Sequence, residues 1–489
     1  MDDIPLIAQD TDLAAWLGDP QNDGRVVQTK LKPSDRVIAR VTDGIYRQPA
    51  SALRELISNA WDADAQNVTI LTDAPRFSRI YVRDDGLGMS DKTLARLMHN
   101  IGGSAKRREE GQELGLSSDA DPDLTPGGRK IIGKIGIGLF SVSQLARRFE
   151  IITKVRGNDY RLVAEIRLHQ YSEDPDIATE NDDEFIAGDV YIRREQTADI
   201  DAHGTDIIMD DIKPRVRDIL RSADRWQAIA EREEALQKGD IDTWASLRAE
   251  RPVYHSGFSG LGIAASQISV LVEQPKLPWS SETPSQTRMS LLMDAVEGEF
   301  TKFDRPDLAN TLDSYLEMIW SLGLSAPVPY VDCHPFDLTG HENIKYFWIT
   351  PGRGRGQELD VNEQTTLRDA VRQQVDGAPE LHEGLDPVGS FSVNIDGLTL
   401  KRPIRFRHHQ SDPRGLEHAV MFVGDFDPNL QPAFDLPTRA GTLKPILLRL
   451  PRALLRKPVG SRGVLARVET CKFCAMARNL LDGTFGPGL

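Results

Sequence analysis

The sequence predicts an α/β sandwich in its first half, with a mixed sheet covered on one face by helices. Apolar residues recur at the 3.6-residue period of helices in four segments, at residues 34–47, 50–64, 91–100 and 137–148. Short apolar or alternating runs typical of strands lie at residues 67–72, 79–83, 149–155, 160–168, 189–193 and 204–210. Helices and strands that interleave along the chain favour a layered α/β domain.

The helix predicted at residues 50–64 carries two stripes. Its apolar stripe, spaced i, i+3, i+4 and i+7, consists of Leu53, Leu56, Ile57 and Ala60. Glu55, Asn59 and Asp62 follow the spacing i, i+4 and i+7 on another face, about 130° away. Such a row of side-chain oxygens can position a water and hold a hard cation, although a solvated helix face has the same pattern.

The strand predicted at residues 79–83 runs into the turn Asp84-Asp85-Gly86-Leu87-Gly88-Met89. Gly86 and Gly88 let the backbone approach a ligand closely, and Asp84 is delivered to a strand end, where sites of α/β proteins tend to lie. An ordinary hairpin turn is the alternative interpretation.

A glycine-rich segment, Gly133-Lys-Ile-Gly136-Ile-Gly138, opens the helix predicted at residues 137–148. Its glycines leave amide N–H groups uncovered at a helix N-terminus, which favours phosphate. The segment lacks the Gly-Lys-Ser/Thr ending of a P-loop, and it does not directly follow a strand as a dinucleotide fingerprint does.

Taken in order, Glu-x3-Asn, Asp-x-Gly-x-Gly and Gly-x2-Gly-x-Gly resemble the GHKL ATPase superfamily. Its members include gyrase B, MutL, MORC proteins, histidine kinases and the heat-shock-protein-90 chaperones. The sequences at residues 55–60 and at Asn100-Ile-Gly-Gly-Ser-Ala-Lys106 are most similar to those of bacterial-style chaperones of the heat-shock-protein-90 type. Gly204-Thr205 matches the family's last nucleotide-site element. The resemblance covers about residues 30–215. It implies the Bergerat form of the α/β sandwich.

The resemblance also implies an ATPase with a Mg²⁺-dependent ATP site. Asn59 would hold Mg²⁺, and Glu55 would orient and deprotonate the attacking water. Asp84 would accept the hydrogen of the adenine N6 amino group, supported by Thr205 through its hydroxyl or a water. The other expected nucleotide contacts are Asp62, Gly86, Gly88, Met89, Asn100, Lys106, Gly133, Ile135, Gly136, Ile137 and Gly138.

We expect four regions along the chain. These are an N-terminal arm at 1–30, a GHKL ATP-binding domain at 31–215 with a lid at about 101–132, a helical connector at 216–255, and a second, transducer-like α/β domain at 256–489. In the last region, residues 259–280 and 285–304 have strand-like composition, residues 306–323 read as an amphipathic helix, and further strands are expected around 390–407 and 418–424.

Charge is distributed unevenly over the 489 residues, whose net charge is −15. Residues 400–489 carry 15 Lys/Arg and 7 Asp/Glu, a balance of +8 that leaves −23 for residues 1–399. This basic segment could meet DNA or an acidic protein client, or it could neutralise its own N-terminal domain. Three cysteines and the lack of a long apolar run favour a cytoplasmic protein without a membrane span.

Two functional hypotheses follow from the resemblance. One is a chaperone-like or MORC-like ATPase, in which lid closure drives an ATP-dependent homodimer to clamp or to remodel a partner. The alternative is a nucleotide-gated DNA-binding module in DNA repair or phage defence. A histidine kinase is excluded, because no histidine precedes His99 to serve as phosphoacceptor on an earlier helix.

Overall fold

The structure is a computed structural model. It describes residues 4–31, 48–99, 117–118, 121, 124–132, 138–168, 188–260, 271–300, 308–331, 337, 339, 346–348, 357–376 and 391–403. The chain forms two compact units. The first unit comprises Met1–Arg288, Leu308–Leu322 and Ser390–Leu400, and the second comprises Met289–Asp307, Gly323–Gly389 and Lys401–Leu489.

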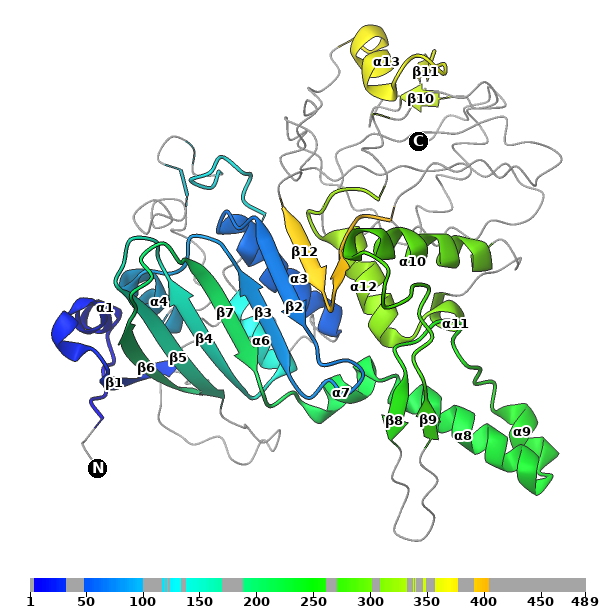
Figure 1. The fold of residues 1–489 in the computed structure, drawn as a ribbon, viewed down its shortest axis with the longest axis horizontal. Coiled ribbons are helices and arrows are strands. Elements are labelled where there is room, and N and C mark those ends of the chain that lie inside the picture. Colours follow the sequence, from blue (N-terminus) through cyan, green and yellow to red (C-terminus); the bar gives the residue numbers. More distant parts are fainter. Residues whose placement is uncertain are drawn as a thin grey trace, which may run out of the picture. The chain divides into compact units, whose positions relative to one another are not determined.

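The first unit is built on a nine-stranded sheet (Figure 1). Its strands are β1 (Val26–Leu31), β2 (Asn67–Leu71), β3 (Ile80–Asp84), β4 (Arg148–Lys154), β5 (Tyr160–Leu168), β6 (Gly188–Gln196), β7 (Gly204–Met209), β12 (Ser392–Ile395) and β13 (Leu398–Thr399). They lie in the order β1-β6-β5-β4-β7-β3-β2-β12-β13. All neighbouring strands are antiparallel except β12, which runs parallel to β2. The predicted mixed sheet is therefore confirmed.

Helices α3 (Pro49–Asp62), α4 (Asp91–His99) and α6 (Gly138–Leu145) cover one face of this sheet (Figure 1). Helix α3 begins where Gln48 is extended and Pro49 takes the first helical position, which needs no N–H donor. Its buried face includes the predicted apolar stripe together with Ala52 and Trp61. Helix α3 packs against α6, so its polar row is carried by a helix fixed in the core.

The N-terminal residues form part of the same unit. Helix α1 (Asp10–Gly18) packs on α4, and the short 3-10 helix η1 (Pro20–Asn22) leads into β1, which pairs with β6 along its whole length. Leu6 extends this edge by bridging to Gln28. The segment that we expected to be an arm thus contains a helix and a strand of the sheet within its own chain.

The β12–β13 hairpin closes the other edge of the sheet. Asp396 occupies its turn with a φ of 47°. One oxygen of the Asp396 carboxylate accepts a hydrogen bond from the backbone N–H of Thr72 at 2.8 Å, and the other accepts from the hydroxyls of Thr72 and Tyr315. These contacts fix a segment from late in the chain to the end of β2.

The rest of the first unit is mainly helical. Its described elements include α7 (Pro214–Leu220), α8 (Ala223–Lys238), α9 (Ile241–Ser246), α11 (Leu308–Thr311) and the hairpin of β8 (Phe258–Gly260) and β9 (Leu271–Glu273). Trp226, Ile229 and Phe258 form a small core there. Within the described residues, no helix is both long and apolar enough to cross a membrane.

Two predicted elements between residues 285 and 325 differ from the structure. The strands expected at 285–304 are wrong, because helix α10 (Ser285–Phe300) occupies this range. Its buried residues follow the helical spacing i, i+3, i+4 and i+7, at Met289, Leu292, Met293 and Val296. The helix expected at 306–323 is divided into α11 and α12 (Ser314–Ser325), since Asp313 accepts the backbone N–H of Leu316 and begins a new helix.

In the second unit, the described elements include a hairpin and a short helix. Strands β10 (Tyr346–Trp348) and β11 (Gln357–Leu359) pair antiparallel, and α13 (Leu367–Gln374) is capped by Thr366, whose side chain accepts the backbone N–H of Asp369. The strand expected at 418–424 and the basic segment from residue 404 onward lie outside the described residues.

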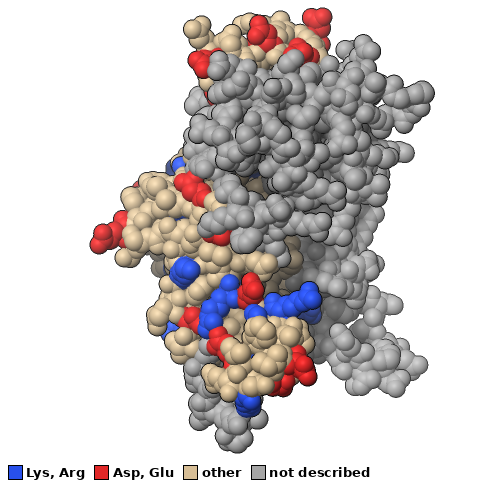
Figure 2. All heavy atoms as spheres, turned by 90° about the vertical axis from the view of Figure 1, so that its right-hand side faces the viewer, with Lys and Arg blue, Asp and Glu red and all other residues tan. Residues whose placement is uncertain are grey.

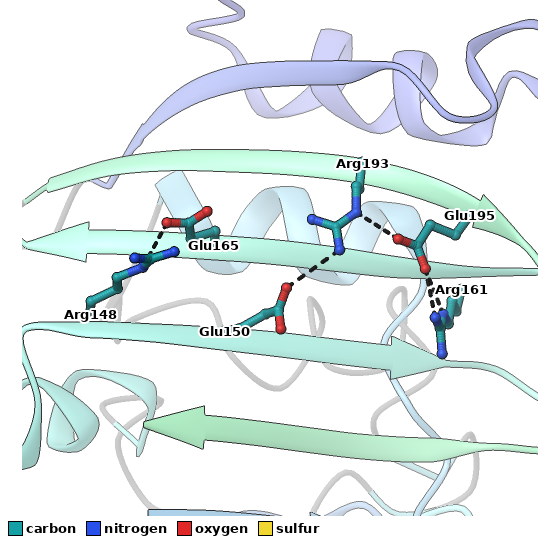
Figure 3. Close-up of polar contacts among 6 residues, drawn as sticks. All are labelled: Arg148, Glu150, Arg161, Glu165, Arg193 and Glu195. Carbon is teal, nitrogen blue, oxygen red and sulfur yellow. Dashed lines mark hydrogen bonds and ion pairs between the residues drawn. The ribbon is translucent and has the colours of Figure 1, made fainter. Parts of the chain in front are cut away.

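The face of the sheet opposite α3 and α6 carries paired charges (Figure 3). Arg193 contacts Glu195 on its own strand β6 at 2.6 Å and Glu150 on β4 at 3.5 Å. Arg161 contacts Glu195 at 2.7 Å, and Arg148 contacts Glu165 at 2.8 Å. Cross-strand pairs of opposite sign suit a solvated sheet face rather than a nucleotide site.

A similar mixture of charges covers the side of the molecule on which α8 and α9 lie, where Figure 2 shows Lys and Arg beside Asp and Glu. Arg251 contacts Glu273 at 2.9 Å and also pairs with Glu233, and Lys238 pairs with Glu234. Interspersed signs do not create the single-sign field that attracts a polyanion. The described part of this side therefore does not have the character of a nucleic-acid surface.

Candidate functional site

The polar row on α3 lies at the boundary between core and solvent. Glu55 and Asp62 are half-buried and Asn59 is exposed, whereas their neighbours Leu53 and Ile57 are fully buried. A carboxylate oxygen of Glu55 lies 3.3 Å from a guanidinium nitrogen of Arg54. The helix thus presents two carboxylates and a carboxamide along one side, as the spacing predicts.

Asp84 ends β3 on the face that the helices cover. The alternation of β3 puts it in register with the buried residues Ile80 and Val82. Its Oδ1 accepts the backbone N–H of Gly86 at 2.9 Å, and the backbone N–H of Thr205 also bonds to the carboxylate. Burial raises the pKa of Asp84 to about 6, which the two N–H donors oppose and the nearby carboxylates of Asp85 and Asp206 reinforce.

The neighbouring Asp85 has a different role. Its Oδ1 accepts the backbone N–H groups of Gln66 and Asn67, each at 2.7 Å, and its Oδ2 accepts from the Asn67 side chain at 2.7 Å. Burial raises the pKa of Asp85, but these hydrogen bonds from Asn67 and Gln66 outweigh it and the net pKa is lowered. Asp85 therefore anchors the start of β2, and Asp84 is left as the carboxylate of the candidate site.

Glycines pack the Asp84 turn tightly against its neighbours. Gly88 has a φ of +72°, and a Cβ there would lie 2.0 Å from the carbonyl oxygen of Lys154. Gly204 has a φ of +122°, and a Cβ there would lie 2.1 Å from the carbonyl oxygen of Asp84. A Cβ at Gly86 would lie 2.7 Å from the carbonyl oxygen of Ala63, just after α3. These glycines bring β3, β4, β7 and the end of α3 together around Asp84.

Thr153 joins these elements, and sequence reasoning missed it. Its buried hydroxyl accepts the backbone N–H of Met89 at 2.7 Å and lies 3.2 Å from the hydroxyl of Thr205 and 3.3 Å from the carbonyl oxygen of Gly204. Thr205 thus supports Asp84 through its backbone N–H, while its hydroxyl faces Thr153. The signal in the sequence was a threonine in register with the apolar residues Phe149 and Ile151, which form the inward face of β4.

The end of α3 also holds residues 124–132, which lead towards the glycine-rich segment. Asp62 Oδ1 accepts the backbone N–H of Ile132 at 2.9 Å, and the indole N–H of Trp61 donates to the carbonyl oxygen of Lys130 at 2.9 Å. Asp64 Oδ2 accepts the backbone N–H of Gly127 at 2.7 Å. Asp62 therefore bonds to this segment in the structure, and its expected contact with the nucleotide stays a prediction.

Comparison with known proteins agrees with this arrangement. The family model described as histidine kinase-, DNA gyrase B- and HSP90-like ATPase matches residues 46–205. Residues 46–205 belong to the GHKL ATPase superfamily. The matched range includes α3, the Asp84 turn and Gly204-Thr205, which are the elements gathered around the candidate site.

Individual relatives of the GHKL domain come from two kinds of protein. The chain is 31% identical over 140 residues to the chaperone protein HtpG of Methylobacterium sp. (strain 4-46), which is 25% of this chain and 22% of the relative. It is 44% identical over 77 residues to the DNA mismatch repair protein MutL of Bacteroides fragilis (strain YCH46), which is 15% of this chain and 12% of the relative. The similarity thus spans about a fifth or less of the length of these curated relatives.

Several expected contacts of the GHKL domain cannot be placed. Asn100, Lys106, Gly133, Ile135, Gly136 and Ile137 lie outside the described residues, as does the greater part of the predicted lid. The backbone of Gly138 begins α6, as expected for the end of the glycine-rich segment.

The described residues of the GHKL domain fit Mg·ATP by their chemistry. Asp84 offers a desolvated acceptor beside a turn that only glycine can make, and α3 offers the oxygens of Glu55 and Asn59. Among the described residues, no three His, Cys, Asp or Glu side chains gather as a metal cage. Mg²⁺ commonly takes one or two protein ligands together with water and phosphate oxygens, so a single carboxamide suits it.

Proposed function

We propose that the GHKL domain binds Mg·ATP and hydrolyses it to ADP and phosphate. The observation that supports the proposal most directly is the buried, hydrogen-bonded position of the Asp84 carboxylate. The carboxylate is desolvated on the helix-covered side of the sheet and is held by the backbone N–H groups of Gly86 and Thr205. A fixed acceptor in such a place favours a ligand that donates hydrogen bonds, as the adenine N6 amino group does.

The helix α3 supplies the groups for the reaction. Asn59 would hold Mg²⁺ through its carboxamide oxygen, and the bound ion would neutralise part of the charge on the phosphate oxygens. Glu55, one helical turn earlier, orients the attacking water and accepts its proton. Because both side chains project from one rigid helix, their separation is set by the helix and not by a loop.

We further propose that the nucleotide state controls association between copies of the chain. The resemblance to HtpG supports a chaperone-like cycle, in which closure of the predicted lid at about 101–132 accompanies clamping of a homodimer around a partner. The fixed position of α3 and the Asp84 turn supports such a cycle, because both would contact the bound nucleotide.

A second candidate function is a DNA-binding module gated by the same nucleotide. The balance of +8 in residues 400–489 favours it, as does the local similarity to MutL, a DNA mismatch repair protein. In this case ATP hydrolysis resets the module, and DNA binding weakens steeply with salt.

One set of measurements on the full chain tests both candidates. ATP affinity and turnover should be measured with and without Mg²⁺, and against GTP as the base-specificity control. Molecular mass in solution should then be measured with ATP, ADP and a nonhydrolysable ATP analogue, and turnover repeated with DNA. Lack of ATP binding would refute the proposal. A nucleotide-dependent dimer indifferent to DNA would support the clamp, and salt-sensitive DNA stimulation would support the module.

A further inference from the structure

One peptide unit of the Asp84 turn, between Gly86 and Leu87, is bonded on both sides by other elements. The Leu87 N–H donates to the carbonyl oxygen of Ala63, just after α3, at 2.8 Å. The Gly86 carbonyl oxygen lies 2.8 Å from Nδ1 of His203, which directly precedes β7. Gly86 is buried, so water does not readily replace a lost bond there. The orientation of this peptide unit is therefore set by the end of α3 on one side and by His203 on the other.

The partners of His203 determine which ring nitrogen carries the hydrogen. A carbonyl oxygen can only accept, so Nδ1 carries the hydrogen that bonds to Gly86. The other ring nitrogen, Nε2, contacts a guanidinium nitrogen of Arg156, and a guanidinium can only donate. Nε2 therefore accepts, and both bonds are made by the neutral ring. Arg156, in the turn between β4 and β5, thus favours the form of His203 that donates to Gly86.

The backbone on both sides of His203 is fixed to β4 and the turn that follows it. The Lys154 ammonium donates to the carbonyl oxygens of Asn158 and Ala202, each at 2.9 Å. The next residue after the histidine, Gly204, pairs with Lys154 in the sheet. The His203 ring is therefore presented to the Asp84 turn from a chain segment that is bonded before and after it.

The Gly86 carbonyl matters for the site because the N–H of the same residue holds Asp84. This N–H donates to Asp84 Oδ1 at 2.9 Å, and the bond opposes the effect of burial on the pKa of the carboxylate. Glycine restricts its own φ and ψ less than any other residue, so the direction of this N–H depends on outside contacts. Loss of the His203 bond leaves the peptide unit after Gly86 with one anchor fewer and lets the N–H turn away from Asp84.

We propose that His203 is a positioning residue of the nucleotide site, which orients the Asp84 carboxylate through the Gly86 carbonyl and so contributes to ATP affinity and to the preference for adenine. The inference rests on the proposed function and adds to it a side chain outside the polar row of α3 and outside the glycine motifs. Its effect passes through the backbone of the turn and needs no contact with the nucleotide.

The test compares ATP and GTP affinity in full-length variants, with thermal unfolding measured on each preparation. His203→Leu removes the donor and should weaken ATP binding by roughly three- to tenfold, the equivalent of one hydrogen bond, and reduce the preference for ATP over GTP. His203→Asn places an amide N–H as far along the side chain as Nδ1 and should recover most of the affinity. His203→Gln places its amide one bond further, where Nε2 lies, and should resemble the leucine variant.

The pH dependence of ATP affinity separates a positioning role from a merely structural one. When the Gly86 N–H leaves Asp84, the pKa of that carboxylate should rise further, because burial and the nearby carboxylates of Asp85 and Asp206 are then opposed by one N–H fewer. The midpoint of the affinity loss in His203→Leu should therefore lie above the wild-type midpoint, by up to about one pH unit. In His203→Asn the midpoint should return to the wild-type value.

His255→Leu is the matched control. His255 is also a histidine of the first unit and is 5% exposed, but it lies shortly before β8, with its ring centroid 5.2 Å from that of Trp226. This variant should lower the unfolding temperature without changing ATP affinity. Wild-type affinity or an unshifted midpoint in His203→Leu, or an equal loss of affinity in His203→Asn or His255→Leu, would overturn the inference while the proposed function stands. Failure of the wild type to bind ATP would overturn both.

Discussion

The hydroxyl of Thr153 accepts the backbone N–H of Met89 at 2.7 Å, and this bond fixes the end of the Asp84 turn to β4. Replacing Thr153 by valine leaves the Met89 N–H without its partner in a buried place. We expect Thr153→Val to lower the free energy of unfolding by about 1–3 kcal/mol and to weaken ATP binding. Urea unfolding and calorimetric titration measure the two effects. Thr69→Val is the control, because Thr69 lies on the face of β2 opposite the buried residues Val68 and Ile70. Its free energy of unfolding should stay within about 0.5 kcal/mol of the wild-type value.

Glu55 separates an ATPase from a passive nucleotide binder. If it activates the water, Glu55→Ala should lower turnover by about 100-fold or more and leave ATP affinity nearly unchanged, since the side chain acts in the transition state. Single-turnover hydrolysis and binding should be measured on one preparation. Loss of both ATP affinity and turnover would mean that Glu55 has a structural role. Unchanged turnover would mean that another residue is the general base, with Asp62 the first alternative.

Asn59 tests the metal assignment. Asn59→Ala should abolish the Mg²⁺-dependent part of ATP binding without unfolding the protein, because the residue is exposed and lies on a different side of α3 from the apolar stripe. Calorimetric titration with ATP in the presence of Mg²⁺ and in the presence of a chelator isolates that part. Wild-type affinity in the variant with Mg²⁺ present would contradict the assignment.

Asp84 should give ATP binding a pH dependence. Its pKa of about 6 means that the carboxylate in the free protein becomes protonated as the pH falls through that value. Since only the ionised form is a full acceptor for the N6 amino group, ATP affinity should fall by roughly tenfold per pH unit below about pH 6. Asp84→Asn should bind ATP weakly at every pH and should not prefer ATP over GTP. A variant with the wild-type preference would make Asp84 a turn residue only.

The same carboxylate should make the protein less stable at neutral pH. The pKa is higher in the folded state than the ordinary value of 3.8, so the folded state binds more protons between pH 3.8 and about 6. The free energy of unfolding therefore decreases as the pH rises through this window and is constant above it. Asp84→Asn should remove this slope and raise stability at pH 7 by about 1–3 kcal/mol, measured by urea unfolding at several pH values.

The charged sheet face should contribute little to stability. Glu195 bonds to Arg161 and Arg193 but keeps about a quarter of its side chain exposed, at 26%. Glu195→Gln should change the free energy of unfolding by less than about 1 kcal/mol, and the difference should shrink as salt is added. ATP affinity in this variant should match the wild type, because the pairs lie on the face away from α3.

Local periodicity carried most of the ATP-domain prediction. The apolar stripe of α3 and the alternation of β3, β4 and β5 are repeated within short segments, so each element was visible without knowledge of its neighbours. The polar row on α3 was visible for the same reason. The choice between Asp84 and Asp85 as the adenine contact came from the motif and stays a prediction. In the structure, the alternation of β3 turns Asp84 towards the helices.

Features that depend on distant pairing could not be predicted. Nothing in residues 391–400 indicates that they join β2, since a parallel neighbour is chosen by packing and not by a local turn. The Arg129 guanidinium lies against the rings of Trp61 and Phe391, which are distant in the sequence, so no local pattern indicates these contacts. Helix α10 is a different case. Its i, i+3, i+4, i+7 spacing is visible in the sequence, but the strand prediction followed the composition of residues 285–304 instead of that spacing.

The parallel pairing of β12 with β2 also has a consequence for the order in which the protein is made. The ribosome adds 320 residues between Leu71 at the end of β2 and Ser392 at the start of β12. At ordinary rates of translation this interval lasts roughly 15–65 s. During that time the N–H and C=O groups along one edge of β2 have no neighbouring strand to bond to, and such an exposed edge can pair with a strand of another chain. Folding of the nucleotide domain is thus completed late, and ribosome-bound chains that end before residue 391 should be more prone to aggregate than those that extend past residue 400.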